Sequence, residues 1–173
     1  NTLEGRVVEE DAAADLRSLR AAFARLIRDT SAFPVAISPL KAASWGVPDG
    51  WLRPGLVVDA YGPHVGSTPR GLRVANHIQR RPRILQWSAH VAAFGEVPVT
   101  IVGENPGWRG VQAARSFQHL KDLYRAHRFY VHTADPVLED GYNLASLEAM
   151  ASGLPVLGTC HPSSVTEDGI TRR

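Results

Sequence analysis

Two acidic residues, Asp140 and Glu148, stand at opposite ends of a glycine-containing turn that runs into a short helical stretch. The first backbone N–H groups of a helix have no partner within the helix, so this end attracts anions such as phosphate. Glu148 stands well inside the stretch, where a carboxylate accepts hydrogen bonds from hydroxyl groups. A sugar nucleotide carries both phosphates and hydroxyls, and the pattern therefore predicts a site for one.

The segments around this pair alternate between short apolar runs and helical periodicity. Strands are expected at residues 72–75, 97–102, 129–132 and 156–159, with helices at 83–94, at 111–126 and from Leu144 to the Gly153–Pro155 stop. This order predicts an α/β fold, a Rossmann-like parallel sheet with helices on both faces. Sites in such sheets lie beyond the carboxyl ends of the strands, so the loops after the four strands should form one rim.

The first third of the chain is less regular. Residues 9–30 carry leucine, phenylalanine and isoleucine at three- and four-residue spacing, which predicts an amphipathic helix. Residues 33–38 indicate a short buried strand that ends at Pro39, and residues 41–64, rich in glycine and proline, indicate a connection without regular structure. The chain starts without methionine and stops after a turn-like segment, so we expect a fragment of a longer protein.

Composition excludes several classes of protein. The 173 residues are 44% hydrophobic and 21% charged, an ordinary globular balance. A net charge of +2 is too small to indicate nucleic acid as a partner. The single cysteine excludes an internal disulfide and favours a reducing, cytoplasmic location. No apolar run approaches the roughly 18 residues of a membrane span, and no signal peptide is visible.

Residues 140–159 resemble the signature of the retaining glycosyltransferases that have two Rossmann-like domains (GT-B), family 4. That signature places two glutamates across a glycine-aromatic turn, followed by Leu-Glu-Ala-Met-Ala, a small residue, glycine, an apolar residue, proline and valine. Here Asp140 takes the place of the first glutamate. Two further stretches resemble the family: Asn76 and Arg81 occupy its arginine and lysine positions after the first donor-domain strand, and Gly103 ends the second strand.

The resemblance implies a role for each matched residue. Glu148 would bind the ribose hydroxyls, Asp140 would position the transferred sugar, and Arg81 would neutralise charge on the departing diphosphate. Asn76 and Gly103 would also contact the donor, and no metal or other cofactor is expected. The phosphates would lie against the backbone of Gly141, Tyr142, Asn143 and Leu144. The partners implied are a nucleotide-sugar donor and a carbohydrate, lipid or small-molecule acceptor.

By the same resemblance, residues 56–173 form the donor-binding domain, truncated at its C-terminus. Residues 1–55 would be the end of the acceptor domain and the interdomain linker, and any peripheral membrane contact would belong to the missing part. We expect this fragment alone to lack transferase activity. Two alternatives stay open: a nucleotide-sugar 2-epimerase of the same fold, and a fragment that binds a nucleotide sugar without turning it over.

Overall fold

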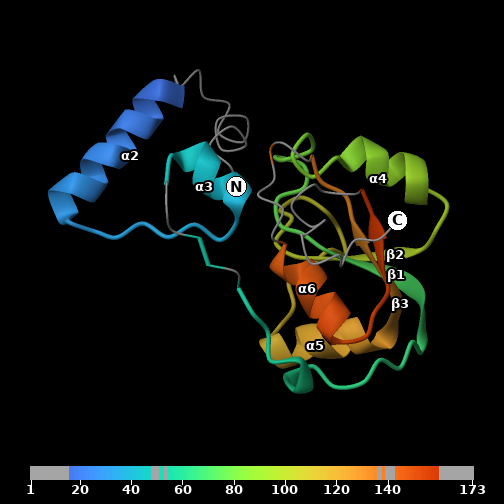
Figure 1. The fold of residues 1–173 in the computed structure, drawn as a ribbon. Helices are drawn as coiled ribbons and strands as arrows, with labels where there is room; N and C mark the ends of the chain where they lie inside the picture. Colours follow the sequence, from blue (N-terminus) through green and yellow to red (C-terminus); the bar gives the residue numbers. More distant parts are fainter. Residues whose placement is uncertain (1–15, 48–50, 53, 136–137, 139–142, 160–173) are drawn as a thin grey trace. The chain divides into compact units, whose positions relative to one another are not determined.

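The computed structural model describes residues 16–47, 51–52, 54–135, 138 and 143–159. Internal contacts divide the chain into two units. The helical unit contains the described residues up to Pro54, together with 134–135 and 138. The α/β unit contains residues 55–133 and 143–159 and carries the sheet (Figure 1).

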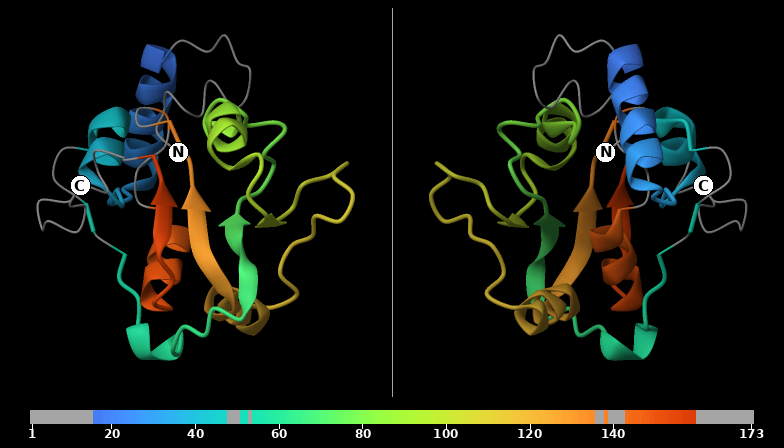
Figure 2. Two further views of the ribbon diagram at one scale, coloured as in Figure 1. Left: turned by 90° about the vertical axis from the view of Figure 1, so that its right-hand side faces the viewer. Right: turned by 90° about the vertical axis from the view of Figure 1, so that its left-hand side faces the viewer.

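The α/β unit is built on a four-stranded parallel sheet with the order β2-β1-β3-β4. Its strands are β1 (Thr68–Val74), β2 (Val99–Val102), β3 (His127–His132) and β4 (Val156–Gly158). The arrows of β1, β3 and β4 all point the same way in Figure 2. The sheet grows from β1 to β2 on one side and then continues through β3 on the other. The strand order therefore reverses between β1 and β3, which is where open parallel sheets place their ligands.

Helices cover both faces of this sheet. The helices α5 (Phe117–Ala126) and α6 (Leu144–Ala151) lie side by side on one face and contact β1, β3 and β4 (Figure 1). The helix α4 (Trp87–Phe94) packs on side chains of the other face, where Phe94 stacks on Phe129 with ring centroids 6.4 Å apart. The predicted α/β, Rossmann-like parallel sheet is therefore confirmed.

Local signals explain where two of these helices begin. The Ser116 hydroxyl caps α5 by accepting from the His119 backbone N–H, so this helix starts later than the predicted residue 111. Residues 111–112 instead run beside the end of β2, because the Gly103 N–H donates to the Gln112 carbonyl. Gln86, in a left-handed conformation with φ of 44°, similarly delays the start of α4.

The hydrophobic core lies between the sheet and the α5/α6 layer. It combines strand residues with residues of the two helices, and its buried members are Leu72, Val102, Tyr124, Tyr130, Ala149 and Leu154. The alternation of side chains along a strand sends Leu72 and Tyr130 to this face and their neighbours Arg73 and Phe129 to the α4 face. Gly153, with a positive φ of 74°, ends the α6 segment and leads into the buried Leu154.

The helical unit corrects two predictions. The helix α2 (Leu16–Thr30) is present, but residues 33–38 form a single bridge from Ala36 to Trp51 rather than a strand. A second helix, α3 (Pro39–Trp45), occupies a stretch predicted to lack regular structure. Ser38 caps α3, Pro39 fits its first turn, and Gly46 ends it in the left-handed region. Pro39 thus starts a helix here instead of ending a strand.

Phe23 of α2 packs edge-on against Trp45 of α3, with ring centroids 5.1 Å apart. The Arg20 Nε group also donates to the Ser44 carbonyl at 2.8 Å, which ties the two helices together. None of the helices in the described residues is both long and apolar enough to cross a membrane.

Candidate functional site

The loops after β1 and β2 are joined by side-chain hydrogen bonds. The Asn76 Oδ1 atom accepts from the Glu104 backbone N–H at 2.8 Å, and the Asn105 amide donates to the Ala75 carbonyl at 2.8 Å. Asn105 also accepts from the Ile78 N–H at 2.9 Å. We call these three bonds the asparagine clasp. It fixes the carboxyl edge of the sheet at β1 and β2.

The clasp explains two of the residues predicted to contact the donor. Gly103 has a φ of 142°, and a Cβ atom there would collide with the Ala75 carbonyl oxygen and the Asn76 side chain. Glycine is required because the two loops approach so closely. Asn76 uses its side-chain oxygen to hold this approach together. Both residues lie on the predicted rim, and their contacts in the structure are with the neighbouring loop.

Arg81, predicted to neutralise the leaving diphosphate, lies in the turn that follows. Its backbone N–H donates to the His77 and Ile78 carbonyls at 3.0 and 3.2 Å, and its side chain is half-buried. The turn brings Arg81 to the same edge of the sheet as Asn76 and Gly103. Asn76, Gly103 and Arg81 therefore lie on one rim, and their contacts with a donor stay a prediction.

A small hollow of about 60 Å³ opens beside the clasp. It is lined by His77, Gln79 and Arg80 from the loop after β1, and by Asn105 and Pro106 from the loop after β2. Sequence reasoning did not select His77 or Gln79. The available signal was that polar residues, such as Asn76 and Asn105, directly follow two predicted strands.

The start of α6 is the predicted phosphate-binding element. Asn143 caps it: its side-chain oxygen accepts from the Ser146 N–H at 2.9 Å. Leu144 is the first helical residue and is exposed. The N–H groups of a first helical turn have no intrahelical acceptor, which leaves this end electropositive. Asp140, Gly141 and Tyr142 lie outside the described residues.

Glu148 lies on the inner side of α6, and its carboxylate accepts hydrogen bonds from two tyrosines. The Tyr124 hydroxyl of α5 donates to one oxygen at 2.9 Å, and the Tyr61 hydroxyl donates to the other at 3.4 Å. Tyr61 follows the short 3-10 helix η1 (Val58–Ala60). Burial first, and the nearby Glu148 charge second, raise the pKa of Tyr61, so its hydroxyl keeps its proton. Glu148 thus joins α5, α6 and the segment before β1, a role that the sequence did not reveal.

A buried guanidinium lies beneath the rim on the α4 face. Arg73 of β1 is 2% exposed; one of its terminal amino groups donates to the Leu85 carbonyl at 2.7 Å and to the Thr133 carbonyl at 3.4 Å. Its guanidinium carbon lies 5.5 Å from the centre of the Trp87 ring. Thr133 also donates through its hydroxyl to Leu85 at 2.8 Å. These bonds connect the loop after β1 to the end of β3, across the point where the strand order reverses.

His90 completes this buried group. Its ring stacks on Trp87 with centroids 4.6 Å apart. Burial, and secondarily the charge of Arg73, lower the pKa of His90 from 6.5 to about 4. The imidazole is therefore neutral near pH 7.

Comparison of the chain with models of known protein families gave no match, and a search of curated proteins gave none either. In the part of the chain that the structure describes, no three His, Cys, Asp or Glu side chains gather closely enough to hold a metal ion.

Proposed function

We propose that the α/β unit binds a nucleoside-diphosphate sugar at the carboxyl edge of its sheet, as the donor-binding domain of a retaining glycosyltransferase. The observation that carries the proposal is the helix α6. It begins at a capped N-terminus after β3, one of the two strands at the reversal point, and it bears the signature residues 143–158 as helix, glycine turn and strand. This is the local structure that the resemblance requires.

The rim contributes the remaining chemistry. In the described part of the chain, the backbone N–H groups of Leu144 and Ala145 at the start of α6 have no acceptor, whereas that of Ser146 is capped by Asn143, and Arg81 lies on the same edge after β1. In the proposed reaction the bond from the anomeric carbon to the diphosphate breaks, and a bond from the same carbon to the acceptor oxygen forms on the same face. The acceptor proton passes to the departing diphosphate. Arg81 stabilises the charge that develops on that group, which raises the rate more than ground-state binding does.

Glu148 has two tasks in this proposal, because a carboxylate has more acceptor positions than its two tyrosine bonds use. The tyrosines hold the carboxylate in place, and its remaining lone pairs accept from the ribose hydroxyls. Asp140 contacts the transferred sugar, as the resemblance implies.

Calorimetric titration of the chain with UDP-, GDP- and ADP-sugars tests the proposal. We expect one of these donors to bind the wild type, and Glu148→Gln to weaken that binding about tenfold, the effect of losing one hydrogen bond to a charged group. If the wild type binds none of them, the proposal is wrong.

Two variants separate donor binding from the structural contact of Glu148. Tyr124→Phe removes the shorter tyrosine bond but keeps the carboxylate, and we expect donor affinity within about twofold of wild type. Glu104→Gln removes an exposed carboxylate at the rim and serves as the charge control. Equal weakening by Tyr124→Phe and Glu148→Gln would mean that packing of α5 on α6, rather than ribose binding, sets the affinity.

A further inference from the structure

We infer that Tyr61 makes an autoinhibitory contact: its hydrogen bond to Glu148 competes with the hydroxyls of a bound nucleoside, so nucleotide binding loosens the segment that carries Tyr61. This inference rests on the proposed function, because it requires a ribose at Glu148. The segment comprises residues 58–63, which include η1 and follow the boundary between the two units at residue 55. We call it the strap.

The strap runs along α5 and is attached to one side of that helix (Figure 1). Lys121 and Arg125 are four residues apart in α5, so their side chains leave the helix on the same side. The Lys121 ammonium donates to the Ala60 carbonyl at 3.0 Å, and the Arg125 Nε group donates to the Pro63 carbonyl at 3.0 Å. Two hydrogen bonds one helical turn apart therefore hold the strap on α5.

Tyr61 is the point at which the strap also reaches α6. It is 5% exposed, and its ring packs edge-on against Phe117 with centroids 6.0 Å apart. Its hydroxyl donates to Glu148 at 3.4 Å, and in the described part of the chain this is the strap's only hydrogen bond to α6. Tyr124 donates to the other oxygen of the same carboxylate at 2.9 Å. The Tyr61 bond is thus the longer and weaker of the two.

Glu148 cannot serve the strap and a nucleoside equally well. The two neighbouring hydroxyls of a ribose can donate to both oxygens of one carboxylate, and one of these oxygens already accepts from Tyr61. A second donor draws negative charge away from the shared oxygen, which weakens the long Tyr61 bond. Coupling between two binding events is reciprocal, so the Tyr61 bond must in turn lower the affinity for the nucleoside.

Hydrogen exchange of the Ala60 and Tyr61 amides measures the strap, because both N–H groups donate within this segment, to the Val57 and Val58 carbonyls at 3.0 Å. NMR follows these amides in the chain alone and at saturation with UDP, GDP or ADP. We expect a bound nucleotide to speed their exchange about threefold, the effect of losing one weak hydrogen bond. Its 2′,3′-dideoxy form, at the same occupancy, should leave the exchange unchanged.

Tyr61→Phe removes the hydroxyl and keeps the ring. This variant should show the faster exchange without any nucleotide, and it should bind the nucleotide about threefold more tightly than wild type. Tyr124→Phe is the matched control, because it removes the other tyrosine bond to Glu148 from a position outside the strap. The control should change neither the exchange of the strap nor, by more than about twofold, the affinity.

Unchanged or weaker nucleotide binding by Tyr61→Phe would overturn the inference, as would equally fast strap exchange in the Tyr124→Phe variant. The same titrations separate this inference from the proposed function. A nucleotide that binds the wild type and leaves the exchange of the strap unchanged would contradict only the coupling. If none of UDP, GDP and ADP binds, the glycosyltransferase proposal and the coupling are both wrong.

Discussion

On the face covered by α5 and α6, the sheet buries mainly apolar and tyrosine side chains, and the Glu148 carboxylate of α6 accepts from two hydroxyls. On the α4 face it buries a charged guanidinium and a histidine among aromatic rings, with backbone carbonyls as the acceptors for Arg73. Figure 1 shows the α5 and α6 pair as one layer. The two faces of one sheet thus have different compositions.

The difference shows how the sheet divides its tasks. The α5/α6 face carries the hydrophobic core cluster of the unit, and hydrophobic burial is the dominant favourable contribution to stability. On the α4 face, hydrogen bonds from Arg73 join the loop after β1 to the end of β3. These bonds fix the positions of two loops of the rim. Stability measurements on variants of each face can test this division.

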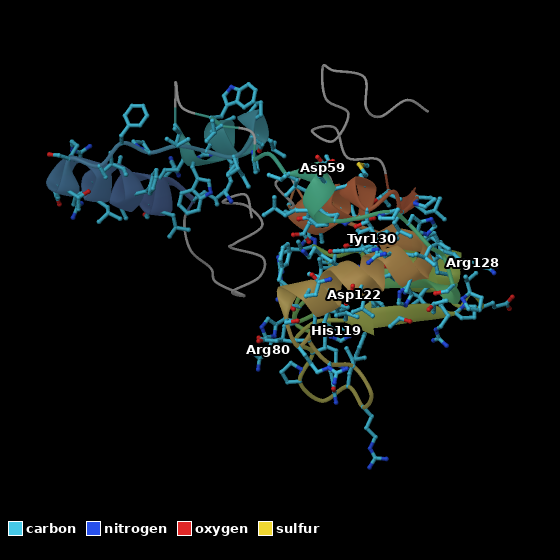
Figure 3. The ribbon with its side chains drawn as sticks, turned by 90° about the horizontal axis from the view of Figure 1, so that it is seen from below. Asp59, Arg80, His119, Asp122, Arg128 and Tyr130 are labelled. Carbon is cyan, nitrogen blue, oxygen red and sulfur yellow. The ribbon has the colours of Figure 1, made fainter. Side chains whose placement is uncertain are left out.

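The largest effect is expected from Tyr124→Ala on the α5/α6 face. Tyr124 is fully buried, and truncation of a large aromatic side chain leaves a cavity that costs about 3–5 kcal/mol. Tyr124→Phe should cost only about 1 kcal/mol, the value of one hydrogen bond. Urea unfolding measures both, with Asp122→Asn on the exposed side of α5 as the control (Figure 3). Similar losses for the two Tyr124 variants would mean that the bond to Glu148, rather than packing, stabilises this face.

A smaller loss is expected from Arg73→Met on the α4 face. Methionine fills much of the space but removes the donor to the Thr133 carbonyl, which leaves a buried acceptor unsatisfied at about 1–3 kcal/mol. Arg70→Met, an exposed residue of the same strand, is the matched control and should change little. If Arg73→Met is as stable as wild type, the guanidinium only fills space and the comparison of the two faces fails.

The smallest effect is a pH dependence from His90. Its pKa in the folded chain is about 4, below its ordinary value of 6.5, so the unfolded chain binds more protons between these values. Stability from this group is full above about pH 6.5 and is lost as the pH falls towards 4. Linkage predicts a loss of about 1–2 kcal/mol between pH 7 and pH 5. Unfolding of wild type and His90→Phe at both pH values measures it, and identical losses would exclude His90 as the cause.

The strand and helix pattern of the α/β unit was predictable because its apolar runs are short, regular and separated by turn residues. The predicted strands at 72–75, 97–102, 129–132 and 156–159 all have counterparts in β1 to β4. The helix α3 was not predicted because proline is common both after a strand and in the first turn of a helix. The Ser38 cap and the left-handed Gly46 indicate the helix at this position.

The candidate site was predictable only in part, because a sequence motif gives the type of a residue and not its partners. Asn76, Gly103 and Arg81 lie at the carboxyl edge of the sheet because the strands before them were predictable. The clasp from Asn76 and Asn105 depends on two loops meeting across strands that are distant in the sequence. The tyrosine partners of Glu148 come from two other segments in the same way. Such pairings follow from the sheet order, which local periodicity does not specify.

Gly71 of β1 leaves room for the ring of Phe129 on the neighbouring strand, and an added Cβ atom would lie 2.7 Å from the tip of that ring. The same ring stacks on Phe94, so the missing side chain sets how closely α4 sits on the sheet. The size of the side chain that fits at position 71 therefore depends on the size of the side chain at position 129. A larger residue at 71 requires a smaller one at 129, and homologous chains should exchange the two sizes together or keep both.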